Sequence, residues 1–183
     1  MFHAFVREAD RLVRVDIAGT NPPAILWADI VHPTAEDAEN AAALLGIALP
    51  TLPEMQEIEP SARLYEEAGA RFMTVPIVVG LDGDAPRLAP VTFILGAESL
   101  ATVRHAESAP FEQVIARRLR TNGATTAETL MLDLIEAIVD RVADVLERSA
   151  LHCDTVSRDV FARKAAGGGA EGPARDLEAV LGR

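Results

Sequence analysis

Three glutamates in one short segment are the residues whose type and spacing best suit a metal ion. Glu54, Glu57 and Glu59 lie in the stretch PEMQEIEP. Carboxylate oxygens are the ligands that Mg²⁺ and other hard divalent cations prefer. A second interpretation stays open, because Glu54 follows Thr51 at the spacing of a helix capping box and the other two can simply be solvated. The segment therefore predicts either a surface or interface site for a divalent cation, or an exposed acidic turn.

The four histidines are His3, His32, His105 and His152, and they are widely spaced. None of them forms the paired spacing on one helix that holds zinc in many enzymes. A metal site assembled across the fold stays open, but the favoured interpretation places His32 at a helix entrance and His152 on a helix surface.

Other motifs that resemble chemical sites have simpler explanations. Asp82-Gly83-Asp84 resembles the start of a calcium loop, but no acidic ligand follows at the twelfth position, so a hairpin turn is favoured. Glycines 167–169 are not followed by Gly-Lys-Ser/Thr and are interpreted as a linker rather than a phosphate loop. Cys153 has no nearby basic group to activate it, which favours an inert helical thiol. Nothing in the sequence supports catalysis, so the chain is not expected to be an enzyme.

The charge and composition narrow the range of partners. The chain has 183 residues, with 28 acidic against 17 basic side chains and a formal net charge of -11. Such a surface repels phosphate backbones and anionic lipids, which argues against nucleic-acid binding, and it attracts cations. The single cysteine excludes an internal disulfide. The N-terminus does not have the pattern of a secretory signal, and the run from Ala41 to Leu49 is too short to span a membrane, so a soluble chain is expected.

The elements that position these residues begin with two expected strands and two expected helices. The strands are Arg11–Ile17 and Ile25–Ile30, joined by a turn at Gly19–Pro23. Thr34 is expected to cap a helix that stops at Gly46. Thr51 is expected to start a second helix that runs to about Glu59-Pro60.

The middle of the chain predicts an antiparallel meander followed by a helix. Its strands are expected at residues 62–66, 71–79, 90–95 and 100–104, joined by short turns that favour antiparallel neighbours. Pro76 within the second of these strands predicts a bulge or an edge position. A helix is expected from Phe111 to about Arg120, ended by Asn122-Gly123.

One long helix is expected from Thr125 to Lys164, with Thr125 and Glu128 at capping-box spacing. An apolar stripe and an opposite acidic face are predicted along it. The stripe comprises Met131, Ile135, Ile138, Val142 and Val145, widened by Leu134 and Leu146. The acidic face comprises Asp133, Glu136, Asp140, Asp144 and Glu147. At this length the helix exceeds what a compact monomer needs, and we expect its stripe to pack against a partner helix.

The predicted fold class is α/β (α+β): an α/β/α sandwich with a mixed, largely antiparallel sheet of about six strands, followed by a long helical arm. Three parts are expected: an α/β domain at 1–123, the long helix at 124–166, and a Gly-rich turn with the start of a truncated second helix at 167–183.

Several segments, taken in order, resemble the cytosolic N-terminal domain of the CorA family of divalent metal transporters. The matching segments are Leu26–Ile30 with Pro33, Leu45–Ile47, Ile58–Glu67, Phe72–Thr74, Val91–Leu95, Leu100–Arg104, and Leu134–Arg141 with Asp144 and Glu147. They span nearly the whole chain.

The resemblance implies a homopentamer on the cytoplasmic face of the inner or plasma membrane, whose subunits end in two membrane-spanning segments with a Gly-Met-Asn signature. It also implies that intracellular Mg²⁺, with Co²⁺, Ni²⁺ or Zn²⁺ as alternatives, binds between subunits and holds the channel closed. The chain contains no Gly-Met-Asn sequence and no spanning segment. Under this resemblance it is the soluble part of a transporter, with membrane contact only through the absent spans. Glu54 and Glu57 are then the expected regulatory metal ligands.

Two further hypotheses stand beside the transporter one. The chain could be a helical interaction module, whose long helix pairs with partner helices through its apolar stripe. The third and weakest is an enzyme with a site dispersed across the sheet.

Overall fold

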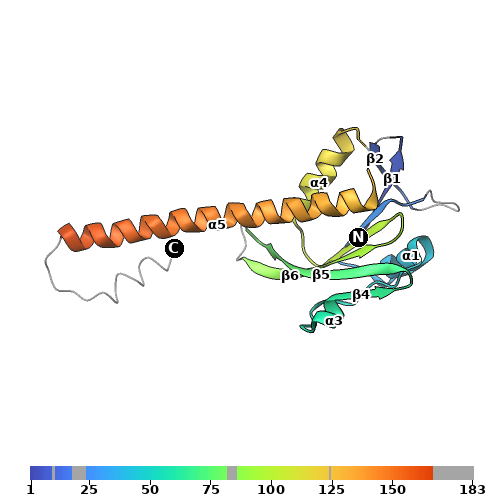
Figure 1. The fold of residues 1–183 in the computed structure, drawn as a ribbon, viewed down its shortest axis with the longest axis horizontal. Coiled ribbons are helices and arrows are strands. Elements are labelled where there is room, and N and C mark those ends of the chain that lie inside the picture. The colour runs from blue at the N-terminus through green and yellow to red at the C-terminus, as the bar shows by residue number, and fades with distance from the viewer. Residues whose placement is uncertain (10, 18–23, 82–85, 124, 167–183) are drawn as a thin grey trace. The chain divides into compact units, whose positions relative to one another are not determined.

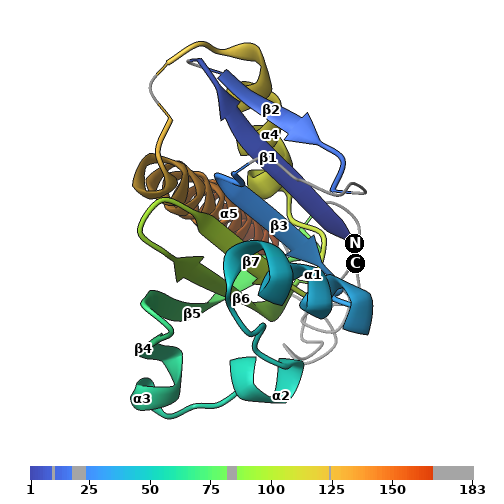
Figure 2. The same cartoon turned by 90° about the vertical axis from the view of Figure 1, so that its right-hand side faces the viewer.

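A seven-stranded sheet forms the centre of the fold (Figures 1 and 2). The computed structural model describes residues 1–9, 11–17, 24–81, 86–123 and 125–166, with the side chains of 161–166 excepted. Across the sheet the strand order is β2-β1-β3-β7-β6-β5-β4. The strands are β1 (Phe2–Glu8), β2 (Arg11–Val15), β3 (Trp27–Val31), β4 (Leu64–Glu67), β5 (Ala70–Val79), β6 (Arg87–Leu95) and β7 (Leu100–Arg104).

The sheet is mixed and largely antiparallel, as predicted. Among the described strands only β3 and β7 pair in parallel, with Trp27 opposite Leu100 and Val31 opposite Arg104. The sequence did not predict β1, which lies between β2 and β3 and pairs antiparallel with both. This missed strand explains why the observed sheet is larger than the predicted one.

Helices cover both faces of the sheet, which confirms the predicted α/β/α sandwich. On one face lie α4 (Ala109–Arg120) and the beginning of α5 (Ala127–Ala166); on the other lie α1 (Ala35–Leu45), α2 (Leu52–Met55) and α3 (Pro60–Arg63) (Figures 1 and 2). Each face has its own apolar core. The first contains Trp27, Phe93 and Phe111, and the second contains Ile30 and Phe72.

Two of the predicted helix starts are confirmed. Thr34 caps α1 through a capping box with Asp37, and Gly46 ends that helix in the left-handed conformation at φ 68°. Thr51 caps α2 through a capping box with Glu54. The second predicted helix is too long, because α2 ends at Met55 and a separate turn of helix, α3, begins at Pro60. For the same reason the following strand, β4, begins later than predicted, at Leu64.

Pro76 occupies an edge position without a bulge. The pairing of β5 with β6 is continuous from Arg71 to Val79, with Pro76 opposite Pro90. On its other side β5 pairs with β4 only as far as Met73. Proline is tolerated here because no neighbouring strand requires its missing N–H.

The predicted cap of the long helix is wrong by one residue. The N–H of Thr129 donates to Oγ1 of Thr126 at 3.2 Å, and the N–H of Thr126 donates to Oγ1 of Thr129 at 2.8 Å. Thr125 instead donates its hydroxyl to the carbonyl of Gly123 at 2.9 Å. The start of α5 therefore uses a Thr–Thr pair rather than the predicted Thr125 and Glu128.

The buried face of α5 also differs from the predicted stripe. Leu130 and Leu134 are fully buried in the first core, and Met131 and Ile138 pack against it, whereas Ile135 is exposed. Asp133 does not lie on a solvated acidic face, because its carboxylate pairs with Arg118 and, at 3.1 Å, with Nη2 of Arg117. These contacts attach the beginning of α5 to α4 and the sheet.

The chain divides into two compact units, Met1–Arg141 and Val142–Arg183. The beginning of α5 thus belongs to the α/β unit, and its continuation from Val142 belongs to the second. The predicted turn at 19–23, the hairpin at 82–84 and the linker and second helix at 167–183 lie outside the described residues. The predicted domain boundaries stay a prediction.

Candidate functional site

Glu54, the first predicted metal ligand, is held by the start of α2. Its Oε2 accepts hydrogen bonds from the backbone N–H of Thr51 at 2.7 Å and from the Thr51 hydroxyl at 2.8 Å. These hydrogen bonds lower the pKa of the Glu54 carboxyl, so it is ionised at neutral pH. Glu54 therefore has a structural role and carries a fixed negative charge.

Glu57, the second predicted ligand, lies beyond the end of α2 and lines a hollow of about 260 Å³ together with Glu54 and Glu67. Tyr65 lines the same hollow. The pKa of Tyr65 is raised, first by burial and then by the charges of Glu67 and Glu54. The two carboxylates contribute a local negative potential, which favours a cation in this hollow. Glu67 is a residue of this group that the sequence did not single out.

The three carboxylates do not form a closed metal cage. Within the described ranges, no group of three or more His, Cys, Asp or Glu side chains has an arrangement that could hold a metal ion. Glu59, the third acidic residue of the segment, is the N-cap of α3 and is not among the residues that line the hollow.

A buried ion pair joins β3 and β7 and lies at the centre of a network of hydrogen bonds. The sequence did not predict it. Arg104 donates from Nη2 to Oδ2 of Asp29 at 2.9 Å and from Nε to Oδ1 at 3.2 Å, a bidentate geometry. The side chains of Asp29 and Arg104 are 0% and 1% exposed. Thr102 donates its hydroxyl to Oδ1 of Asp29 at 2.8 Å and accepts from Nε1 of Trp27 at 3.1 Å.

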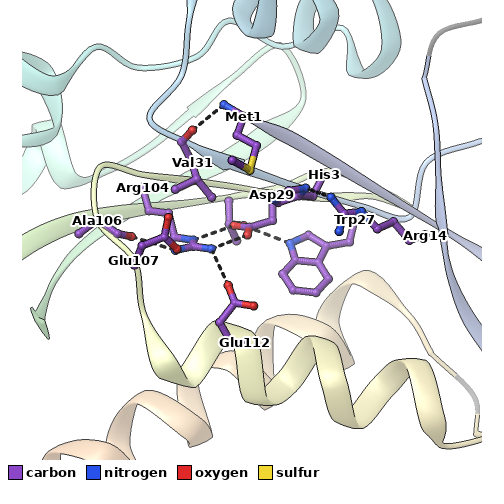
Figure 3. A network of polar contacts seen from close by, with 11 residues as sticks. Met1, His3, Arg14, Trp27, Asp29, Val31, Arg104, Ala106, Glu107 and Glu112 are labelled. Atoms are coloured by element: carbon purple, nitrogen blue, oxygen red, sulfur yellow. Dashed lines mark hydrogen bonds and ion pairs between the residues drawn. The ribbon is translucent and has the colours of Figure 1, made fainter. Parts of the chain in front are cut away.

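The remaining donors of Arg104 connect the sheet to α4. Its Nη1 donates to the carbonyl of Ala106 at 2.9 Å, and its Nη2 lies 3.4 Å from Oε1 of Glu112 on α4 (Figure 3). The guanidinium also lies 5.0 Å from the centre of the Phe111 ring. Burial acts to lower the pKa of Arg104, but the hydrogen bonds and charge of Asp29, with the nearby glutamates, raise it overall. Arg104 therefore stays cationic, and this network serves to hold β3, β7 and α4 together.

The sequence contains a signal for this pair. The segments WADIV and LATVR are strands whose residues are all buried, and each holds one charged residue. A charged residue in a fully buried strand needs a partner, so two such strands predict that their charges meet.

Both histidines whose place the sequence predicted lie there, and His32 comes just before Thr34, the N-cap of α1. His3 accepts a hydrogen bond from Arg14 at Nδ1, and burial followed by the charge of Arg14 lowers its pKa. His152 is exposed on α5, as expected. His32 and His105 follow the ends of β3 and β7 and contact each other, with ring centres 6.2 Å apart. The sequence did not predict this contact. Cys153 is an exposed residue of α5.

None of the described helices combines the length and the apolar character that a membrane crossing requires.

The chain matches a family model described as "CorA-like Mg2+ transporter protein" over residues 23–171. It is 30% identical over 163 residues to the magnesium transport protein CorA of Haemophilus influenzae (strain Rd), covering 88% of this chain and 51% of that protein. It is 28% identical over 164 residues to the magnesium transport protein CorA of Escherichia coli K12, covering 88% of this chain and 52% of that protein. The chain thus spans about half the length of these relatives.

Solved structures show the same fold. The complete structure of the CorA magnesium transporter from Methanocaldococcus jannaschii has a TM-score of 0.72 at 14% identity, covering 100% of this chain and 55% of that one. The ZntB cytoplasmic domain from Vibrio parahaemolyticus has a TM-score of 0.66 at 9% identity, covering 84% and 64% of the two chains. The sequence resemblance is therefore confirmed. The family model extends over most of the chain, and the chain belongs to the family of CorA-like Mg²⁺ transporter proteins.

Proposed function

We propose that this chain is the cation-sensing and assembly part of a divalent-cation transporter, with Mg²⁺ as the ion. The observation that carries the proposal is the family match from residue 23 to 171, which includes the α/β unit from β3 onward and the whole of α5. The relatives are named magnesium transport proteins, which supports Mg²⁺ over Co²⁺, Ni²⁺ or Zn²⁺. The role is regulatory rather than enzymatic, since the matching family consists of ion transporters.

The proposed regulatory ligands are Glu54 and Glu57, with Glu67 lining the same hollow. Mg²⁺ commonly binds through one or two carboxylates and keeps several of its waters, so it does not need a closed cage of protein ligands. A partner subunit would supply further oxygens in the assembled protein. The proposed assembly is a homopentamer at the cytoplasmic face of the membrane.

Magnesium binding at this hollow can be followed through Tyr65, the only tyrosine of the chain. Selective ¹³C labelling of tyrosine gives one ring signal, and we expect that signal to shift in a saturable way as Mg²⁺ is added. The thermal unfolding midpoint should rise with the same concentration dependence, because Mg²⁺ binds the folded state.

The variant Glu57→Gln should weaken the Mg²⁺ dependence of both readouts several-fold, because it removes one charge from the hollow without disturbing the α2 cap. Glu39→Gln is the matched control, since Glu39 is an exposed glutamate of α1. Equal behaviour of the two variants would assign the effect of Mg²⁺ to the overall charge of −11 rather than to this hollow.

A helical interaction module is the second candidate function, favoured by exposed apolar side chains on α5. Leu146 and Leu151 are 65% and 59% exposed. This alternative predicts a stable oligomer at all Mg²⁺ concentrations, which Leu146→Glu dissociates. The transporter proposal predicts that any oligomer of this chain depends on the divalent cation. Sedimentation velocity with and without Mg²⁺ distinguishes the two.

A further inference from the structure

The contact between His32 and His105 results from the parallel pair of strands. Val31 of β3 is opposite Arg104 of β7. The residue that follows each of them is a histidine, so His32 and His105 lie side by side at the same end of the two strands. The N–H of His32 donates to the carbonyl oxygen of Arg104 at 2.8 Å, which fixes the two backbones beside each other. The carboxyl ends of parallel strands are a common place for ligands in sheets covered by helices.

The two rings are arranged edge to face, with an interplanar angle of 82°. His32 has a φ of 47°, a left-handed conformation that is unusual for a residue other than glycine. Such strained conformations persist where the surrounding structure enforces them, and they gather at functional sites. The backbone thus holds the His32 ring next to His105 at some energetic cost.

His105 has an unused nitrogen. Its Nε2 is buried and has no hydrogen-bond partner in the part of the chain that the structure describes. Buried polar atoms nearly always have a partner, so this nitrogen is a candidate ligand atom. Burial, followed by the charge of His32, lowers the pKa of His105.

A cavity of about 570 Å³ lies beside His32, and Glu107, Ser108 and Glu112 line it too, whereas His105 is not among its lining residues. The side chain of Glu107 is 72% exposed, and its carboxylate is held by a 3.4 Å contact with Nη1 of Arg104. It can therefore turn toward a cation at modest cost. Arg87 and Arg141 line the cavity too, so a cation has to be held by the imidazoles and carboxylates rather than by the cavity as a whole.

We propose that His32 and His105 together bind one divalent cation of borderline softness, namely Zn²⁺, Co²⁺ or Ni²⁺, with Glu107 and water completing the coordination. Imidazole nitrogen suits these ions, whereas Mg²⁺ prefers oxygen ligands. A tetrahedral ion bound at both rings places their centres roughly 5 Å apart. The observed separation is 6.2 Å, so small side-chain rotations close the site.

Two protein nitrogens define an exchangeable site rather than a permanent structural one, because structural zinc sites use four protein ligands. As the described side chains stand, no group of three or more His, Cys, Asp or Glu can hold a metal ion, so Glu107 can join the two imidazoles only after leaving Arg104. The inferred site is separate from the Glu54 and Glu57 hollow and does not depend on the proposed function.

Titration calorimetry of the chain with Zn²⁺ tests the inference. Excess Mg²⁺ is present to occupy sites made of oxygen ligands. One Zn²⁺ per chain is expected, and Co²⁺ should give a visible absorption spectrum typical of nitrogen coordination. His32→Asn should weaken Zn²⁺ binding by at least about tenfold. Asparagine tolerates the left-handed conformation at residue 32, so this variant is expected to fold. His105→Gln should weaken binding to the same extent, with its fold checked by circular dichroism.

His152→Gln is the matched control, because His152 is an exposed histidine on α5, and it should leave Zn²⁺ affinity unchanged. Glu57→Gln should also leave it unchanged, which separates this site from the proposed Mg²⁺ hollow. Unchanged Zn²⁺ affinity in folded His32→Asn would overturn the inference, as would loss of binding in His152→Gln.

Discussion

Replacing Asp29 with alanine is expected to lower the free energy of unfolding by about 3–5 kcal/mol, because it leaves the buried charge of Arg104 without its main partner. Arg104 is 1% exposed and cannot recover hydration by turning outward. The hydroxyl of Thr102 loses its acceptor in the same change. Urea unfolding followed by the fluorescence of Trp27 measures the effect, because Trp27 is the only tryptophan and is fully buried beside the network.

Two comparisons make this expectation specific to the buried pair. Glu66→Gln breaks the ion pair with Arg71, whose side chains are 71% and 66% exposed, and should cost only about 0–1 kcal/mol. The double variant Asp29→Leu with Arg104→Met removes both charges and should recover most of the stability lost in Asp29→Ala. A double variant as unstable as the single one would show that packing, rather than an unpaired charge, dominates at this position.

Local sequence patterns predicted those strands and helix caps that are determined by residues close together in the sequence. The strand Leu100–Arg104 has the predicted bounds, and the caps at Thr34 and Thr51 form as predicted. These features depend on residues within a few positions of one another: a short run of strand-forming residues, a hydroxyl before a helix, and a glycine after it. Such signals are present in the sequence itself.

Strand β1 was missed because its neighbours, rather than its composition, make it a strand. Phe2–Glu8 includes His3, Arg7 and Glu8 and carries no clear turn signal before it. It extends because β2 and β3 pair with it on both sides. Strand preference is strongly dependent on such context, so a single sequence gives little indication of it.

The one-residue error at the start of α5 has a tertiary cause. The segment TTAET offers two capping threonines in succession, Thr125 and Thr126. The core decides between them, because Ala127 and Leu130 are buried and must face the sheet. The cap at Thr126 is compatible with that orientation, and the buried Thr125 satisfies its hydroxyl on Gly123.

The candidate sites differ in the same way: one depends on residues that are close in the sequence, and the others depend on the pairing of distant strands. Glu54 and Glu57 are close in the sequence and could be proposed from it. The pairs Asp29–Arg104 and His32–His105 are assembled by the parallel register of β3 and β7. Periodicity identifies strands but not which strands are neighbours, so these contacts could not be derived from spacing. A rule that buried charges must be paired could still have suggested the first of them.

The second large effect is expected in α5, where Leu134→Ala should destabilise the fold by about 2–5 kcal/mol. Leu134 is 0% exposed and belongs to the same core as Phe111 and Val114. Removing its side chain leaves a cavity where α5 packs within the α/β unit. Leu146→Ala is the matched comparison, because Leu146 lies on the same helix but is 65% exposed. It should change the free energy of unfolding by less than about 0.5 kcal/mol.

The pair of leucine variants measures where α5 stops being part of the α/β unit. That unit ends at Arg141, so an apolar side chain before this residue should contribute to stability and one after it should not. Urea unfolding of both variants at several protein concentrations makes the comparison. If Leu146→Ala costs as much as Leu134→Ala, and the cost grows with protein concentration, then Leu146 is buried against another copy of the chain in solution. The apolar residues beyond Val142 would then form an assembly surface, and whether that assembly requires Mg²⁺ would distinguish the transporter proposal from the helical interaction module.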